Sequence, residues 1–227
     1  SAGPAFEGGA IEQGMRATAG AIDRVWIHSG RLCVHVVDDV APRGICGSGL
    51  VDAVAVLLES GILDASGRMF SRLEAQEAGL AEAWVRRLNE RNGVQAFVLS
   101  DAVVLTQQDI RQLQLAKAAI AAGIRVLAGT AGIAVAEIDK VFLAGAFGNY
   151  ISLDSAIRVG IVPESLRGRI QVAGNAAGAG ACSVLLSKAA RLQVETLGKT
   201  TRHVSLADHP DFSDLYMEEL AFPEREA

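Results

Sequence analysis

The feature that most constrains the fold is a repeated unit in which an apolar strand runs into a glycine turn that opens a helix. The unit occurs at residues 140–144 before Gly145, and again at residues 170–172 before Gly174. Helical spacing follows both turns, and the second predicted helix spans about 176–191. Alternation of this kind is typical of a layered α/β fold. The sequence therefore predicts an α/β domain with a mixed sheet and flanking helices.

Other segments extend this prediction. Residues 22–28 and 32–37 are rich in β-formers and predict a β-hairpin. The glycines at 44–49 lead into an apolar helix that Gly61 ends. A capping box at 106–109 opens a long helix that ends near Gly129 or Gly132. We further expect a helical excursion over 66–92, a second pair of short strands within 97–105, and a closing tail over 206–222.

Glycine turns at strand ends leave backbone N–H groups open to ligands, often phosphorylated ones. The clearest candidate is Gly145 to Gly148, where a planar base or a ribose could approach the backbone, although a tight corner explains the glycines equally well. Gly47 and Gly49 flank Ser48, which we expect either to cap the helix or to donate to a ligand. No Lys followed by Ser or Thr completes a Walker loop there.

Two further glycine segments carry weaker chemistry. Residues 3–9 include Glu7, the best-placed carboxylate for a metal or a water and the one candidate for a catalytic residue, although a solvated turn acid is the commoner explanation. The small residues at 172–181 favour close helix packing over ligand contact.

Composition excludes several classes of function. The net charge is −5 and aromatic residues make up 5% of the chain, which disfavours nucleic acid as a partner. Apolar runs such as 51–58 and 138–146 are too short for a bilayer, so we expect a soluble, cytoplasmic protein without a membrane partner. Cys33, Cys46 and Cys182 form no CxxC pair and are expected to be small buried hydrophobes. The histidine spacing predicts no metal site, and no sequence motif for a side-chain nucleophile is present.

Five segments, taken in order, resemble the C-terminal domain of the reductive activators of corrinoid-dependent proteins. They are A-G-P-A-F-E-G, G-I-C-G-S-G-L, L-T-Q-Q-D-I-R-Q-L-Q-L-A-K-A-A-I, L-A-G-A-F-G-N-Y-I and G-N-A-A-G-A-G-A. The resemblance covers nearly the whole chain. That family is similar in fold to acetate and sugar kinases, heat-shock chaperones and actin, in which two ribonuclease-H-like lobes close on ATP.

The resemblance implies roles for particular residues. The adenosine-side motif matches Gly145, Ala146, Phe147 and Gly148, and continues into Asn149. The helix that faces the base or ribose from the other side begins at Gly47, Ser48 and Gly49, with Asp52 one turn further on. Gly3 to Glu7 would follow a phosphate-binding hairpin. The implied cofactors are ATP with Mg²⁺, and a 2Fe-2S cluster elsewhere in the parent chain.

By the same resemblance, ATP drives electron delivery to cobalt(II) of a partner corrinoid protein, restoring cobalt(I), and we expect a homodimer. The chain begins at Ser1 without an initiator Met and contains no Asp-x-Gly-Thr hairpin. We therefore expect residues 1–227 to be the C-terminal lobe of an actin-like ATPase domain, cut from a longer protein. The alternatives are a small-molecule kinase of the same superfamily and a non-catalytic docking or dimerisation module in which the helix from Thr106 packs against a second copy.

Overall fold

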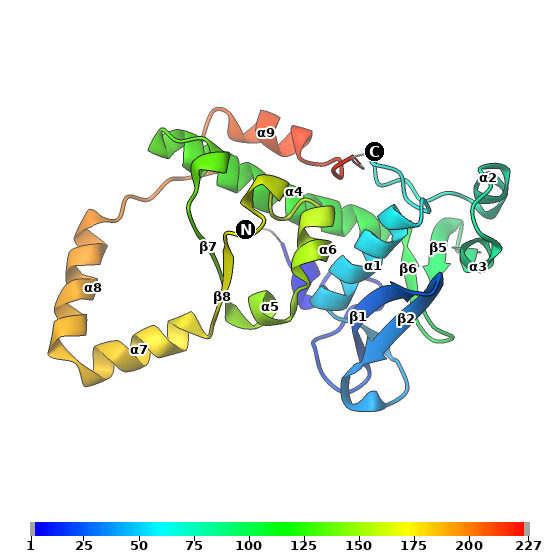
Figure 1. Ribbon diagram of the computed structural model, residues 1–227, viewed down its shortest axis with the longest axis horizontal. Helices are drawn as coiled ribbons and strands as arrows, with labels where there is room; N and C mark the ends of the chain where they lie inside the picture. The colour runs from blue at the N-terminus through cyan, green and yellow to red at the C-terminus, as the bar shows by residue number, and fades with distance from the viewer. Residues whose placement is uncertain (1–2, 225–227) are drawn as a thin grey trace.

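The computed structural model describes residues 3–224 and shows a mixed α/β domain with small sheets and flanking helices (Figure 1). Within these residues the first sheet has the order β2-β1-β3, the second β4-β5-β6, and the third pairs β7 with β8. The β1–β2 pair and the second sheet are antiparallel, whereas β1–β3 and β7–β8 are parallel. The strands are β1 Ala21–His28, β2 Arg31–Val36, β3 Gly44–Ile45, β4 Leu88–Arg91, β5 Val94–Val98, β6 Val104–Thr106, β7 Val141–Ala144 and β8 Ile170–Gly174.

The helices surround these sheets. Short 3-10 turns are η1 Ala5–Glu7, η2 Val37–Asp39, η3 Val135–Glu137 and η4 Glu164–Leu166. The α-helices are α1 Gly47–Glu59, α2 Arg72–Glu77, α3 Glu82–Val85, α4 Gln107–Ala131, α5 Gly145–Tyr150, α6 Leu153–Arg158, α7 Ala176–Leu186, α8 Lys188–Thr200 and α9 Phe212–Glu218.

Helix α1 is the centre of the core. Every residue from Gly47 to Leu58 is buried, so the helix needs neighbours on all sides. It packs on β1, α6, η1 and α4. The predicted hairpin beside it is confirmed, and its turn residues Ser29 and Gly30 both have positive φ, as a two-residue hairpin turn requires.

The predicted capping box at the start of α4 is confirmed. The backbone N–H of Asp109 donates to Thr106 Oγ1 at 3.2 Å, and the N–H of Thr106 donates to Asp109 Oδ2 at 2.8 Å. The helix ends at Gly132, which has φ 73°. In the described part of the chain α4 is the one helix long and apolar enough to span a membrane, and 56% of its most apolar window is buried inside the domain.

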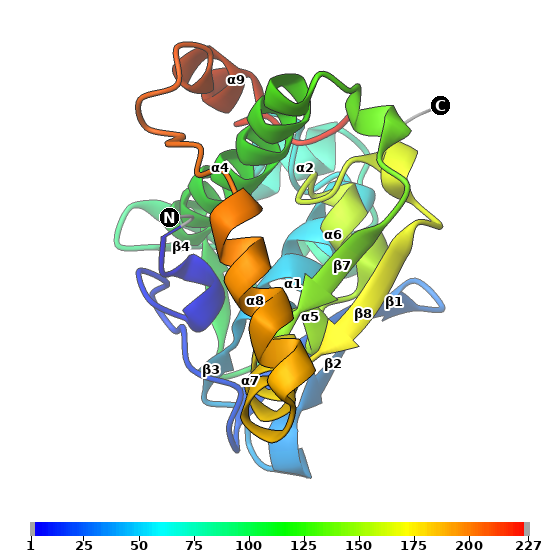
Figure 2. The ribbon, with the colours of Figure 1, turned by 90° about the vertical axis from the view of Figure 1, so that its left-hand side faces the viewer.

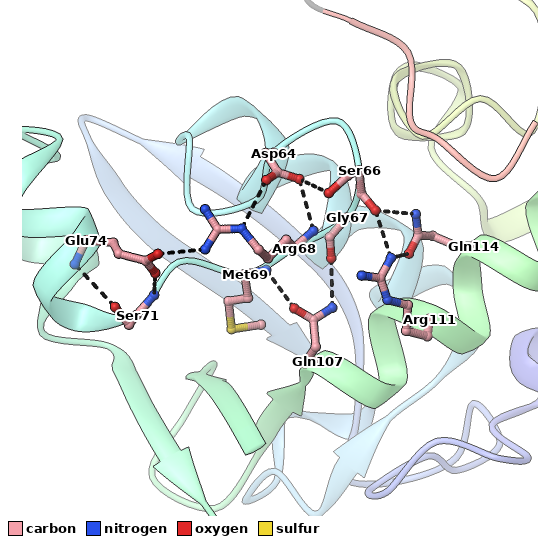
Figure 3. Close-up of polar contacts among 10 residues, drawn as sticks. All are labelled: Asp64, Ser66, Gly67, Arg68, Met69, Ser71, Glu74, Gln107, Arg111 and Gln114. Carbon is pink, nitrogen blue, oxygen red and sulfur yellow. Dashed lines mark hydrogen bonds and ion pairs between the residues drawn. The ribbon is translucent and has the colours of Figure 1, made fainter. Parts of the chain in front are cut away.

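The first half of α4 also fixes the loop that follows α1 (Figure 3). Gln107 accepts from the N–H of Met69 and donates to the carbonyl of Gly67, both at 2.7 Å. The carbonyl of Ser66 accepts from Arg111 at 2.8 Å and from Gln114 at 3.0 Å. These side chains supply hydrogen-bond partners to loop backbone groups that no strand pairs with. The loop is thereby held in place against α4.

The segment Glu219–Glu224, called here the C-terminal strap, closes over α4 and α6. Lys117 donates to the carbonyl of Ala221, and Gln114 donates to the carbonyl of Leu220 at 2.8 Å. Phe222 is 2% exposed, and its N–H donates to the carbonyl of Ala65 at 2.7 Å. The predicted closing tail over 206–222 therefore contains the helix α9 and is anchored in the core by Phe222.

Three expectations about secondary structure are wrong in part. The excursion over 66–92 contains the strand β4 in addition to α2 and α3. The helix predicted over 176–191 stops at Leu186, because extended backbone at Ser187 separates α7 from α8. The apolar strand predicted at 140–144 is present as β7, but an apolar strand is expected to be buried and Phe142 is 61% exposed, because within residues 3–224 β7 and β8 pair only with each other.

Two expectations about packing also change. The small residues of α7 do not make the close contacts that were expected, since no residue of that helix is buried and its main neighbour is α8 (Figure 2). Cys46 is buried as expected, but Cys33 is half-buried and Cys182 is exposed. On α4, Ile110 and Leu113 lie in the core of the domain, whereas Leu115 and Leu127 are 43% and 51% exposed.

We predict that Lys117 makes stability depend on pH. Burial lowers the pKa of its ammonium group to about 8, with Glu219 opposing the shift. In the unfolded chain the pKa is about 10.4, so between these values the unfolded state binds more protons and wild-type stability rises with pH. The free energy of unfolding by urea, measured from pH 7.5 to about 10, should therefore rise relative to that of Lys117→Met. A difference that falls over this range would contradict the assignment.

Candidate functional site

A cleft with a volume of about 800 Å³ lies between β1, α1, α6 and the C-terminal strap. Val25 and Ile27 line it from β1, and Ala55 and Val56 from α1. Ion pairs lie on its rim. Arg167 contacts both Asp154 and Glu164. Arg125 contacts both Glu218 and Glu219. The cleft therefore has an apolar interior and a charged mouth, which is typical of small-molecule sites.

Asp52 is the predicted site residue that lines this cleft. It is 4% exposed, and its Oδ2 accepts a hydrogen bond from the N–H of Val25 at 3.3 Å. Oδ1 has no hydrogen-bond partner within residues 3–224. Burial raises the pKa of the Asp52 carboxyl, and the neighbouring Ser155 hydroxyl and the Val25 N–H oppose the rise. A buried acceptor of this kind is costly unless a donor reaches it, so it marks a candidate contact for a ligand.

Ser48 does not cap α1 as predicted. The cap position belongs to Cys46, which makes no side-chain cap hydrogen bond, and Ser48 lies inside the first turn. Its Oγ donates to the carbonyl of Asp23 on β1 at 2.9 Å. Ser48 and Asp52 are four residues apart on one helix face, and both bond to the same strand.

Gly47 and Gly49 serve close packing. A Cβ on Gly47 would lie 2.0 Å from the carbonyl oxygen of Phe6, and one on Gly49 would lie 2.2 Å from that of Ile22. Only glycine allows η1 and β1 to approach α1 this closely. The turn at Gly47 therefore faces protein backbone, and neither glycine lines the cleft.

The second glycine turn opens α5. Gly145 has φ 86° and open space around its Cα, whereas a Cβ on Gly148 would lie 3.0 Å from the backbone carbon of Leu143. Ala146, Phe147 and Asn149 belong to α5, but their side chains lie outside the described residues. Helix α5 contacts α1 (Figure 1). The predicted turns at Gly47 and Gly145 therefore open helices that are neighbours in space.

Gly3 and Glu7 lie apart from the cleft. Gly3 has φ 82°, and no atom lies within 4 Å of a Cβ added to it. Glu7 is an exposed residue of η1. Sequence reasoning missed the contribution of Ser155 and of the C-terminal strap to the cleft, because no local pattern marks either one. The S-x-x-S pattern at Ser152, which caps α6, was the one available signal, and it indicates only a helix start.

We predict that Gly47→Ala destabilises the domain, because the new methyl group must displace the Phe6 carbonyl or α1 itself. Overpacking of this kind costs about 1–3 kcal/mol. Gly129→Ala is the matched control, since Gly129 lies in α4 with nothing within 4 Å of an added Cβ. Better helix propensity should stabilise it by up to about 1 kcal/mol. Urea unfolding measures both, and equal effects of the two variants would contradict the packing argument.

Comparisons with known proteins agree with one another. A model of the family described as the C-terminal domain of RACo, the ASKHA domain, matches residues 1–227. The corrinoid activation enzyme RamQ of Eubacterium limosum is 36% identical over 224 residues, covering 95% of this chain and 37% of RamQ. The Co(II) methylated amine-specific corrinoid protein reductase of Methanosarcina barkeri is 26% identical over 250 residues, covering 98% of this chain and 41% of the reductase.

A solved structure of a reductive activator for corrinoid, iron-sulfur protein superimposes with a TM-score of 0.83 at 35% identity, covering 98% of this chain and 36% of the activator. The chain thus spans between 36% and 41% of the length of these relatives. Because the family model matches the whole chain, the protein belongs to the family of C-terminal ASKHA domains of RACo-type corrinoid reductive activators.

Proposed function

We propose that this domain is the ATP-binding portion of a longer activator that uses ATP to return cobalt(II) of a corrinoid protein to cobalt(I). The observation that carries the proposal is the match of the entire chain to the ASKHA family model, with relatives named for corrinoid activation. The cleft beside Asp52 supports it, because a volume of about 800 Å³ suits a mononucleotide.

The domain's task in this proposal is conformational. A nucleotide can drive an unfavourable reduction only if ATP and ADP bind the states of the complex differently. Helix α6 is suited to change position when the nucleotide changes, because it lines the cleft and follows α5 and β7 directly along the chain. Filling the cleft would bias the position of α6, and through it the segment that begins at Gly145.

The described residues fit ATP better than they fit a protein-bound metal. Within residues 3–224 no group of three His, Cys, Asp or Glu side chains could hold a metal ion. Mg²⁺ would therefore be held by the phosphates and by other parts of the longer protein. Cys33 lies on β2, Cys46 between β3 and α1, and Cys182 on α7, and they differ in burial, so we place the proposed 2Fe-2S cluster elsewhere in that protein.

The exposed apolar surface supports the finer fold proposal, a ribonuclease-H-like lobe of an actin-like ATPase. Helices α7 and α8 extend away from the rest of the chain (Figures 1 and 2). Leu185 and Leu186 on α7 are 75% and 85% exposed, and Leu197 on α8 is 60% exposed. We propose that further strands of the longer protein extend the β7–β8 sheet and cover this surface. Homodimer formation and a cytoplasmic location remain predictions.

We predict that the longer protein hydrolyses ATP slowly, and faster when a corrinoid protein is added. Gly145→Ala should weaken ATP binding in calorimetry through α5 and α6, because an Ala at positive φ costs about 1–2 kcal/mol and alters the turn that leads into these helices. Gly129→Ala should leave binding unchanged. Hydrolysis that does not respond to a panel of corrinoid proteins would contradict the proposal, and transfer of labelled γ-phosphate to a metabolite would favour the kinase alternative.

A separate prediction concerns α7 and α8. In a protein consisting of residues 1–227 alone, their amides should exchange with deuterium much faster than those of α1, because neither helix contains a buried residue. In the longer protein the same amides should be protected. Equal, fast exchange in both proteins would show that no other part of the chain covers this surface.

A further inference from the structure

The outer edge of β2 is open. Within residues 3–224 β2 pairs with β1 alone, and it lies at the margin of the domain (Figure 1). His28 and Arg31 flank the two-residue turn and form a hydrogen-bonded pair, so hydrogen-bonded and non-hydrogen-bonded pairs alternate from there along the hairpin. The main-chain groups of alternate residues of β2 therefore point away from β1, and these residues are Leu32, Val34 and Val36.

The outward groups of β2 lack the protection that the other hairpin has. No loop or helix of the described residues donates to or accepts from them. On β4, a strand of four residues, Arg72 donates to the outward carbonyl of Leu88 at 2.9 Å, and charged residues follow. Strand β2 has six residues, with neither Lys nor Pro among them. An edge of this kind is a template for another strand.

The apolar side chains on this edge are incompletely covered. Leu32, Val34 and Val36 are half-buried, and they pack against the hydrophobic core from its margin. A strand added beside β2 would lie about 4.8 Å away and would cover more of these side chains. The edge therefore offers apolar contact in addition to main-chain hydrogen bonds.

The charges along β2 select the orientation of an added strand. Arg31 is exposed at the start of the strand, and Asp38 and Asp39 are exposed just beyond its end. A second β2 in the antiparallel orientation brings the Arg31 of each copy toward the aspartates of the other, whereas a parallel strand would align like charges. The edge is thus complementary to itself, as an interface with two-fold symmetry requires.

We propose that the outer edge of β2 is an interface between two copies of this chain, in which the two strands pair antiparallel about a two-fold axis. Pairing that uses every outward donor and acceptor places Val34 opposite Val34 of the second copy, and Leu32 opposite Val36. Between these hydrogen-bonded pairs, Cys33 lies opposite His35 of the other copy. The interface does not depend on the proposed nucleotide function.

Sedimentation of the longer protein over a range of concentrations tests the interface, and we expect a reversible dimer. Val34→Pro removes the central outward donor at an edge position that tolerates proline, and should weaken association about 10-fold. Glu90→Pro is the matched control, because Glu90 holds an outward position on β4, and it should leave association unchanged. Calorimetry should give one ATP affinity for wild type and Val34→Pro, so failure of the interface and failure of the nucleotide function are distinguishable.

The charge argument is tested separately. Arg31→Glu places like charges opposite Asp38 and Asp39, and should weaken association about 10-fold at low salt. Arg86→Glu makes an equal change of charge on α3, outside the hairpin, and should have no effect.

A disulfide tests the register. The Cα atoms of a non-hydrogen-bonded pair lie about 4.5 Å apart, which is within the range that a disulfide spans. Oxidised His35→Cys should therefore form a covalent dimer through residues 33 and 35, mapped to the peptide 32–43. His28→Cys, exposed at the tip of the hairpin, should not. Wild type should not either, since the two copies of Cys33 are diagonal neighbours.

Three results would overturn the interface. One is a longer protein that stays monomeric at every concentration. Another is a dimer that survives both Val34→Pro and Arg31→Glu, since it must use a different surface, such as the exposed Leu115 and Leu127 of α4. The third is crosslinking of His35→Cys only to an added corrinoid protein. If Val34→Pro misfolds by circular dichroism, Arg31→Glu and the disulfide decide.

Discussion

The burial of α1 is the constraint on which the rest of the structure depends. An apolar helix with no exposed face must be surrounded, and its neighbours must come close enough to exclude water. Gly47 and Gly49 make this possible, since the Phe6 and Ile22 carbonyls occupy the space where side chains would otherwise stand. The contacts of α1 with η1, β1 and α6 then determine where the cleft lies, because residues of β1, α1 and α6 form its walls.

Local signals in the sequence were sufficient for individual elements. The hairpin, the capping box at Thr106 and the helix after Gly47 were predicted because each depends on residues that are neighbours in the chain. The candidate site was harder to predict. Gly47, Gly49 and Ser48 carry the pattern of a ligand turn, yet they contact backbone brought in from elsewhere, and Ser48 bonds to a carbonyl 25 residues away. Periodicity contains no information on such partners. Among the predicted residues whose side chains the structure describes, only Asp52 lines the cleft.

The exposed surfaces reflect the same dependence on distant partners. A two-stranded parallel sheet with a half-exposed Phe and an uncovered pair of helices is not a stable arrangement in water by itself. In relatives more than twice as long, additional chain is present that could cover it. Helices α5 and α6 follow β7 directly in the chain and α6 lines the cleft, so only a short stretch of chain separates this sheet from the cleft.

The bond between the Phe222 N–H and the Ala65 carbonyl joins segments more than 150 residues apart in the chain. One wall of the cleft consists of the strap, so this wall exists only after residues 219–224 have been synthesised and have packed on the domain. Until then the residues of α4 and α6 that contact the strap, such as Lys117 and Arg158, are exposed to solvent. The cleft is consequently completed late in the folding of this domain, and loss of the strap would leave the central helix folded but the cleft incomplete.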